Sequence, residues 1–280
     1  MHDGKKLLTN FDTLWQKHAK RLSHCQQTAS EEAVHKLRIN CRRLLALIQL
    51  LQALAPQPAL RKLRKQLKAQ LDSFDELRDT QVMLLKVSDS LDALPDLAAY
   101  QRYLQLNEQR LLIQTPAILQ SLDSAALQPL MEKVGRELNE AFGKTALTPH
   151  ILTAIDSCYR TAMERYRLIT PADPATLHHL RVAVKKLRYM LAAAHELLPV
   201  LPEDHLQRIQ AYLTRLGEIQ NSCVLLDNLN RFFGHLPPPA IHSYFQQCHQ
   251  ALLADYMDHS SEILQFWRPA TYAPFPWQQQ

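Results

Sequence analysis

The fold of this chain is decided by a stretch that is written twice: Ala33–Leu51 reads AVHKLRINCRRLLALIQLL, and Thr176–Leu198 reads TLHHLRVAVKKLRYMLAAAHELL. When the two stretches are aligned, each imidazole or cation of the first meets a similar residue of the second: His35 meets His178, Arg38 meets Arg181, Arg42 meets Lys185 and Arg43 meets Lys186. The repeated order of residue types predicts two copies of one structural element.

Each copy is predicted to be a helix with a basic stripe beside an apolar seam. The aligned His and basic positions follow the spacing i, i+3 and i+7, and Arg188 adds i+10 in the second copy. On a helix that turns about 100° per residue, these positions share an arc of about 80°. The neighbouring arc is apolar in both copies: Val34, Leu37, Cys41, Leu44 and Ile48, and Leu177, Leu180, Val184, Leu187 and Leu191. We call the two stretches the first and second basic helices.

Composition favours an all-helical protein. The 280 residues include only 5 Gly, and good helix formers such as Leu, Ala, Gln and Lys dominate. No apolar run approaches the roughly 18 residues of a membrane span, and the N-terminus lacks the apolar segment of a secretory signal. The 5 Cys are scattered without a C-x-x-C pair. We therefore expect reduced, mostly buried thiols in a cytoplasmic protein, and no disulfide frame, metal site or cofactor.

Charge is segregated along the chain, although the net charge is only +5. Lys and Arg recur between Ala33 and Leu71 without a single Asp or Glu, and the second basic helix has no acid between Pro174 and His195. An ordinary solvated helix face would carry interspersed acids as i,i+4 partners. Their absence from both copies points to an anionic partner that binds one surface.

Helical spacing and breakers predict the remaining elements. A first helix is expected over Lys5–Gln26, and Ser30 is expected to cap the first basic helix. A helix over Ala59–Val87 follows, with a second basic stripe at Arg61, Arg64, Lys65 and Lys68. Further helices are expected over 97–119, 125–142, 150–168, 203–233 and 240–266, with Asp173 and Pro174 starting the second basic helix. Gly143–Pro149 is the best linker candidate.

The helix after each basic helix is duplicated too. Leu71–Leu85 aligns with Leu213–Asp227, so that Asp75 meets Gly217 and Asp79 meets Asn221. Two halves of about four helices each are therefore expected. The predicted organisation is one domain over residues 8–268, with repeats over about 8–142 and 149–268, and a Pro-rich, aromatic tail over 269–280.

These residues resemble the CHAD family, the conserved histidine α-helical domain. Its pattern is an H-x-x-R-x-x-x-R/K helix in each half, followed by a helix with L-G-x-x-R-D or a variant. The first half reads His35, Arg38 and Arg42, then FDELRD over Phe74–Asp79; the second reads His178, Arg181 and Lys185, then LGEIQN over Leu216–Asn221. The E-x-E-x-K mark of the CYTH triphosphatase domain, often fused to CHAD, does not occur, so a stand-alone CHAD protein is expected.

The resemblance implies an all-α fold of two pseudo-symmetric four-helix bundles around a basic central groove or cavity. It also implies non-catalytic binding of inorganic polyphosphate. We expect the binding residues on the basic helices and on the stripe after the first: His35, Lys36, Arg38, Arg42, Arg43, Arg61, Arg64, Lys65, Lys68, His178, Arg181, Lys185, Lys186 and Arg188. The first half should carry more of the positive charge, because Glu203 and uncharged residues stand where the second half would repeat the Arg61–Lys68 stripe.

The residues by themselves leave alternatives open. The chain has no phosphate-binding Gly-rich loop, G-x-S-x-G or metal motif, which argues against an enzyme. A nucleic-acid-binding helical protein would neutralise phosphates in a similar way, although base-stacking aromatics are missing from the basic residues except for Tyr189. A scaffold that docks an acidic protein is the third alternative. For the leading interpretation, a polyphosphate-metabolising protein is a further expected partner, and polyphosphate granules are a further expected location.

Overall fold

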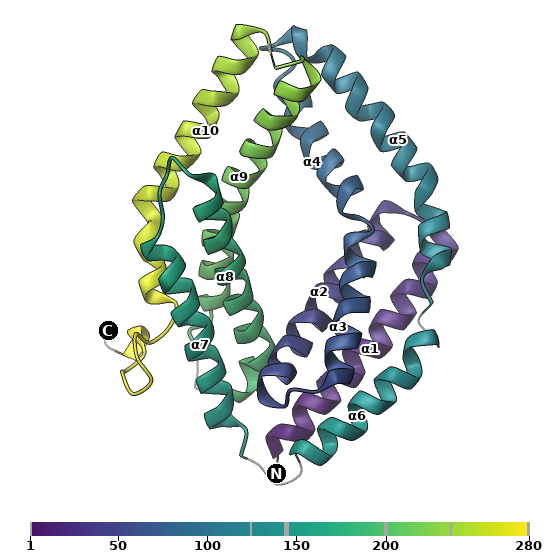
Figure 1. Cartoon of the computed structure of the whole chain (residues 1–280), viewed down its shortest axis with the longest axis vertical. Helices are drawn as coiled ribbons and strands as arrows, with labels where there is room; N and C mark the ends of the chain where they lie inside the picture. Colours follow the sequence, from purple (N-terminus) through teal and green to yellow (C-terminus); the bar gives the residue numbers. More distant parts are fainter. Residues whose placement is uncertain (1, 124, 143–145, 199–200, 236, 279–280) are drawn as a thin grey trace. The chain divides into compact units, whose positions relative to one another are not determined.

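The computed structural model describes residues 2–123, 125–142, 146–198, 201–235 and 237–278, and these residues form helices and turns without a strand (Figure 1). The helices are α1 (His2–Thr28), α2 (Glu31–Leu54), α3 (Pro58–Asp72), α4 (Asp75–Ser88), α5 (Ala98–Ser121), α6 (Gln128–Phe142), α7 (Thr148–Arg167), α8 (Pro174–Ala194), α9 (His205–Phe232) and α10 (Pro239–His259). Short 3₁₀ turns precede α5 and α6, follow α8 and α10, and recur at Pro276–Gln278. The all-α prediction is confirmed.

The two basic helices begin where the sequence predicts. Ser30 caps α2, accepting a hydrogen bond at its Oγ from the Ala33 backbone N–H at 3.3 Å. Asp173 precedes Pro174 at the start of α8, and its Oδ1 accepts from the Ala175 N–H at 3.0 Å. A side-chain acceptor at this position satisfies an N–H that has no partner within the helix.

The expectation of one continuous helix over Ala59–Val87 is wrong. Helix α3 ends at Asp72 and α4 begins at Asp75, with Ser73 and Phe74 in a turn between them. The Phe74 N–H donates to the Leu71 carbonyl at 3.3 Å, a tighter turn than the α-helix makes, and the Phe74 ring is buried at 3 % exposure. Ser73 turns its hydroxyl back onto the Gln70 carbonyl at 2.8 Å, a bond that competes with helix continuation.

The described residues divide into two compact units. The first comprises Met1–Glu76, Leu111–Ile155 and Tyr189–Val200, and it contains α1, α2, α3 and α6. Helix α1 packs on α2 and α6, and α3 packs on the same two helices, so that the four close a ring of contacts. Figure 1 shows α2 and α3 side by side. Leucines at zero exposure, among them Leu44, Leu63 and Leu138, fill the interior of this unit.

The second unit comprises Leu77–Arg110, Asp156–Arg188 and Leu201–Gln280. One of its cores joins the end of α4, the start of α5, and α9 with α10, through Val87, Tyr100, Leu225 and Phe245. The C-terminal segment packs against this unit instead of extending into solvent. Trp267 has zero exposure and Phe275 is 7 % exposed.

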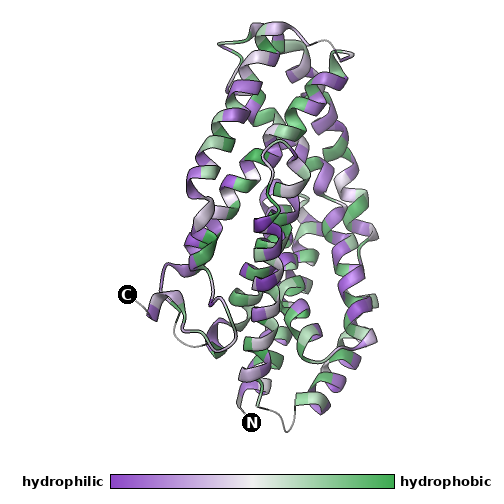
Figure 2. Cartoon of the chain, turned by 60° about the vertical axis from the view of Figure 1, so that its left-hand side comes forward, coloured by the Kyte–Doolittle hydropathy of each residue, from purple (hydrophilic) through white to green (hydrophobic). Residues whose placement is uncertain are grey.

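Apolar seams explain why the basic helices dock in a fixed rotation. All ten predicted seam residues are buried: Val34, Leu37, Cys41, Leu44, Ile48, Leu177, Leu180, Val184, Leu187 and Leu191. Figure 2 shows the matching alternation of hydrophobic and hydrophilic residues along the helices. Burying one arc of a helix leaves the adjacent arc for polar side chains.

Other expectations remain predictions. The division into two sequence repeats, the pair of pseudo-symmetric bundles and the central groove are not tested by the structure. The linker candidate Gly143–Pro149 lies partly outside the described residues, as does Pro199 at the expected end of the second basic helix. Among the described residues, no helix is both long and apolar enough to cross a membrane.

Candidate anion-binding site

The candidate residues of the first basic helix lie at different depths on α2. His35, Lys36 and Arg43 are exposed, Arg42 is half-buried, and Arg38 is buried at 6 % exposure. Lys36 is paired with Glu32 one turn earlier, at 2.5 Å. The predicted stripe therefore runs from solvent into the interface between α2 and its neighbour.

That neighbour is α3, which lies antiparallel to α2. The thiol of Cys41 contacts the Leu67 carbonyl at 3.2 Å, and Arg38, earlier on α2, contacts Leu71, later on α3. Burial raises the pKa of the Cys41 thiol to about 12, so this group remains a neutral donor. The pairing places the basic stripe of α3 on the helix next to the basic stripe of α2.

The four stripe residues of α3 are all exposed: Arg61, Arg64, Lys65 and Lys68. Lys68 is paired with Asp72 at 2.5 Å. The side chains of Arg61, Arg64 and Lys65 make no hydrogen bond or ion pair with any residue that the structure describes. Three cations on one helix are thus available to an anion from solvent.

Arg42 differs from these exposed cations because one of its hydrogen-bond donors is buried. Its Nε is buried, and within the described part of the chain it has no hydrogen-bond partner. A buried N–H without an acceptor costs about 1–3 kcal/mol, which water or a bound anion oxygen can offset. Among the sequence-predicted residues of α2, Arg42 is therefore the one whose environment points most directly to a ligand.

Arg38 already has partners in the protein. Its Nη2 donates to Asp75 Oδ1 at 2.8 Å, and its Nη1 donates to the Leu71 carbonyl at 3.1 Å. Both acceptors flank the break between α3 and α4. Asp75 thus pairs with a basic residue of another helix. The role of the Leu71 carbonyl had no sequence signal, because this carbonyl accepts from Arg38 only where the helix is interrupted.

The second basic helix, α8, presents a different arrangement. His178 and Lys186 are exposed, while Arg181, Lys185 and Arg188 are half-buried. The Nδ1 of His178 lies 2.8 Å from Gln220 Oε1 on α9, and a ring nitrogen facing an amide oxygen at this distance is a donor. Gln220 occupies the position where the family pattern has Arg, a substitution that the sequence shows but whose contact it does not.

Gly217 marks the clearest difference between the two halves. A Cβ added at Gly217 would lie 3.6 Å from Nε and 3.8 Å from Nη2 of Arg181. The aligned position in the first half is Asp75, which instead supplies a carboxylate to Arg38. One position thus holds a carboxylate beside the first arginine and a glycine beside the second.

His178 also lines a cavity of about 590 Å³ within the second unit, between α8, α9 and α10. Cys223, His242 and His249 line the same cavity, and His249 Nδ1 lies 2.7 Å from the Ser222 hydroxyl. Burial lowers the pKa of His249, so that the neutral ring is favoured. Within the described residues, no three His, Cys, Asp or Glu side chains are grouped so that they could hold a metal ion.

Comparisons with known proteins agree on the family. The CHAD domain model matches residues 12–230. The crystal structure of the CHAD domain from the plant Ricinus communis is 18% identical, with 94% of this chain and 90% of that chain covered and a TM-score of 0.64. PptA from Streptomyces chartreusis is 17% identical, with 94% and 98% covered and a TM-score of 0.66. No curated protein matches the sequence. The structural likeness shows the fold, and because the family model matches most of the sequence, the chain belongs to the CHAD domain family.

Proposed function

We propose that this protein binds inorganic polyphosphate, without catalysis by the domain itself, through the cations of α2, α3 and α8. Membership of the CHAD domain family supports the proposal, because this family is linked to polyphosphate-related proteins. The single observation that carries it is a set of cations on two adjacent antiparallel helices of the first unit whose side chains have no partner among the described residues: Arg42 and Arg43 on α2, and Arg61, Arg64 and Lys65 on α3.

The spacing of these cations suits a chain of phosphates. Polyphosphate carries about one negative charge per unit and offers no base or sugar to recognise, so a binder needs a rigid series of cations. A helix places i, i+3 and i+4 side chains about 5–6 Å apart on one face. Arginine adds paired donors that fit phosphate oxygens, and lysine adds a point charge.

The two basic helices are expected to contribute unequally. On α2 and α3 the ligand would meet mainly exposed or half-buried cations. Arg38 is the exception, because it is buried and forms an ion pair with Asp75. On α8 the ligand would meet His178, Arg181, Lys185, Lys186 and Arg188 without a neighbouring stripe like that of α3. We therefore expect the α2–α3 pair to supply the larger share of the affinity.

Titration calorimetry that measures the binding of long-chain polyphosphate at several salt concentrations tests the proposal. The double variant Arg61→Ala with Arg64→Ala removes two unpaired cations and should weaken binding about tenfold, with a shallower dependence on salt because fewer counterions are released. Lys17→Ala with Arg136→Ala is the matched control. Both residues are exposed, belong to the first unit and lie off the stripe, on α1 and α6.

Three outcomes would decide against the proposal. If both double variants weaken binding equally, the attraction follows net charge and not the stripe. If duplex DNA or RNA displaces polyphosphate at equal phosphate concentration, the nucleic-acid interpretation is favoured. Weak binding of polyphosphate by every variant, insensitive to the stripe, would favour a scaffold for an acidic protein. Contacts with a polyphosphate-metabolising protein or with polyphosphate granules would be mediated by the same binding of polyphosphate to the basic helices.

A further inference from the structure

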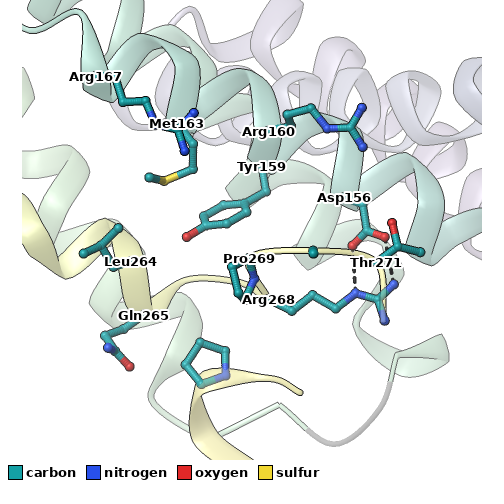
Figure 3. A pocket seen from close by; sticks show the side chains of 12 residues that line it. Asp156, Tyr159, Arg160, Met163, Arg167, Leu264, Gln265, Arg268, Pro269 and Thr271 are labelled. Carbon is teal, nitrogen blue, oxygen red and sulfur yellow. Dashed lines mark hydrogen bonds and ion pairs between the residues drawn. The ribbon is translucent and has the colours of Figure 1, made fainter. Parts of the chain in front are cut away.

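A second candidate site lies in the second unit, away from α8. A cavity of about 510 Å³ opens between the C-terminal half of α7 and the segment that follows α10 (Figure 3). Small-molecule sites in proteins have volumes of about 300–1,000 Å³ and combine apolar walls with a few polar groups. The lining of this cavity has that composition.

The wall opposite α7 is fixed by a buried carboxylate. Asp156 on α7 is 7 % exposed, and its oxygens accept from Arg268 Nε at 2.9 Å, from Arg268 Nη2 at 2.8 Å and from Trp267 Nε1 at 2.7 Å. Burial favours the neutral acid, but these donors together outweigh it and hold the pKa of Asp156 below its usual value. The segment after α10 is therefore anchored to α7, and the one acid among the described residues of the lining, Asp156, is neutralised by Arg268.

Two other arginines of the lining are not neutralised. Arg160 and Arg167 are exposed, and the side chain of neither makes a hydrogen bond or ion pair with the described residues. They are separated by two helical turns, about 10 Å along the axis, and Met163 lies between them on the same face of α7. Figure 3 shows these three side chains on α7, with Leu264, Gln265 and Pro269 on the other side of the cavity.

The same cavity offers apolar surface next to the two cations. Met163, Leu264, Pro269 and Pro276 supply carbon atoms, and the ring of Tyr159 forms part of the wall while its hydroxyl donates to the Ile263 carbonyl at 3.1 Å. The Gln265 amide makes no hydrogen bond with the described residues, so it can serve a polar group of a ligand. One guanidinium group can donate two hydrogen bonds to the oxygens of one phosphate, and the apolar wall can pack against a ring of the ligand.

We propose that this cavity binds a small organic phosphate, with the phosphates on Arg160 and Arg167 and an apolar or aromatic part against Met163 and Leu264. Two guanidinium groups that far apart match a di- or triphosphate better than a single carboxylate. The site shares no residue with the polyphosphate site proposed above. It also differs in chemistry, because inorganic polyphosphate has no apolar part to place on the wall.

Titration calorimetry with ATP, in the absence of divalent cations, tests this site on the whole chain. Loss of two charge-assisted contacts should weaken ATP binding about tenfold or more in the Arg160→Ala, Arg167→Ala double variant. Arg165→Ala is the matched control, because Arg165 is exposed on the same turn of α7 but does not line the cavity. It should leave ATP binding unchanged.

Inorganic triphosphate is the second probe. At this cavity it should bind the wild-type chain more weakly than ATP does, since it gains nothing from the apolar wall, and the double variant should weaken its binding further, because both guanidinium groups that hold the phosphates are gone. Arg61→Ala with Arg64→Ala should weaken polyphosphate binding and leave ATP binding unchanged. A failure of the polyphosphate site can therefore be told apart from a failure of the organic phosphate site. The organic phosphate site is wrong if wild type does not bind ATP, or if the double variant binds ATP as tightly as wild type. Thermal unfolding of each variant shows that the fold is retained.

Discussion

Arg38 and Asp75 form an ion pair at 2.8 Å across the point where α3 ends and α4 begins. The side chain of Arg38 is 7% exposed, whereas that of Asp75 is 50% exposed. The guanidinium of Arg38 also donates a hydrogen bond to the Leu71 carbonyl. In a continuous helix this carbonyl would instead accept from the Asp75 N–H. A residue that the sequence presents as part of a binding stripe thus stabilises the helix break.

Removing either member of this pair should lower stability by different amounts. Arg38→Ala removes one donor from the Leu71 carbonyl, leaves that of the Phe74 N–H, and opens a cavity, which together should cost about 2 kcal/mol of unfolding free energy. Asp75→Asn keeps a hydrogen-bond acceptor beside Arg38, so about 1 kcal/mol or less is expected. Urea unfolding of both variants measures this, with Arg43→Ala, exposed on the same helix, as the control. Equal values for Arg38→Ala and Arg43→Ala would show that the pair is not structural.

Gly217 should respond differently to a methyl group and to a carboxylate. A Cβ there meets no atom closer than 3.6 Å, so Gly217→Ala should stabilise α9 by about 0.5–1 kcal/mol. Polyphosphate affinity should stay unchanged. Gly217→Asp adds a carboxylate next to Arg181, as Asp75 stands next to Arg38, and should weaken polyphosphate binding several-fold.

Calorimetric binding and thermal unfolding of both Gly217 variants provide the check. The alanine variant controls for the added side chain, so the difference between the two variants isolates the charge. Indistinguishable polyphosphate affinities in the two variants would remove Arg181 from the proposed binding site.

Acid should destabilise the first unit through His18. This residue is 1% exposed, its Nε2 lies 3.1 Å from Gln70 Oε1, and burial lowers its pKa from 6.5 to about 4. Because the folded pKa lies below the unfolded one, the stabilising contribution is complete above pH 6.5 and is lost as the pH falls towards 4. The loss should reach about 3 kcal/mol.

Chemical denaturation between pH 7.5 and 4.5, compared with His18→Gln, measures this effect. The variant cannot gain the proton, so its stability should fall less over the same range. Some dependence should remain, since burial also lowers the pKa of His205 and of His249. His24→Gln, at an exposed position on α1, should keep the wild-type slope. Parallel slopes for wild type and His18→Gln would contradict the assignment.

Asp156 should anchor the C-terminal segment. Asp156→Ala leaves the Arg268 guanidinium and the Trp267 indole N–H without their acceptor in a buried position, which should cost about 3 kcal/mol of unfolding free energy. Limited proteolysis after residue 267 should also become faster. Glu164→Ala, exposed and lying two turns further along α7, should change neither measurement.

The sequence alone determined the class of fold and the rotation of the two basic helices. Scarce glycine and the 3.6-residue spacing of apolar side chains predict helices, and the seam of each basic helix is buried as expected. The caps Ser30 and Asp173 were readable because capping depends on residues close together in the chain. The doubled His–Arg pattern is likewise local, and it carried the family resemblance.

Only the tertiary structure decided what each cation does. Helical spacing puts Arg38 and Arg42 on one face. It cannot say that Arg38 meets Asp75 and Leu71, or that the Arg42 Nε is buried with no acceptor in the part of the chain that the structure describes. The contacts of Arg38 across the break at Ser73, and the cavity between α7 and the C-terminal segment, were also unreadable from local patterns. The physical reason is the same in each case: an ion pair, a buried carbonyl or a cavity wall depends on groups far apart in the chain, and folding alone sets which of them meet.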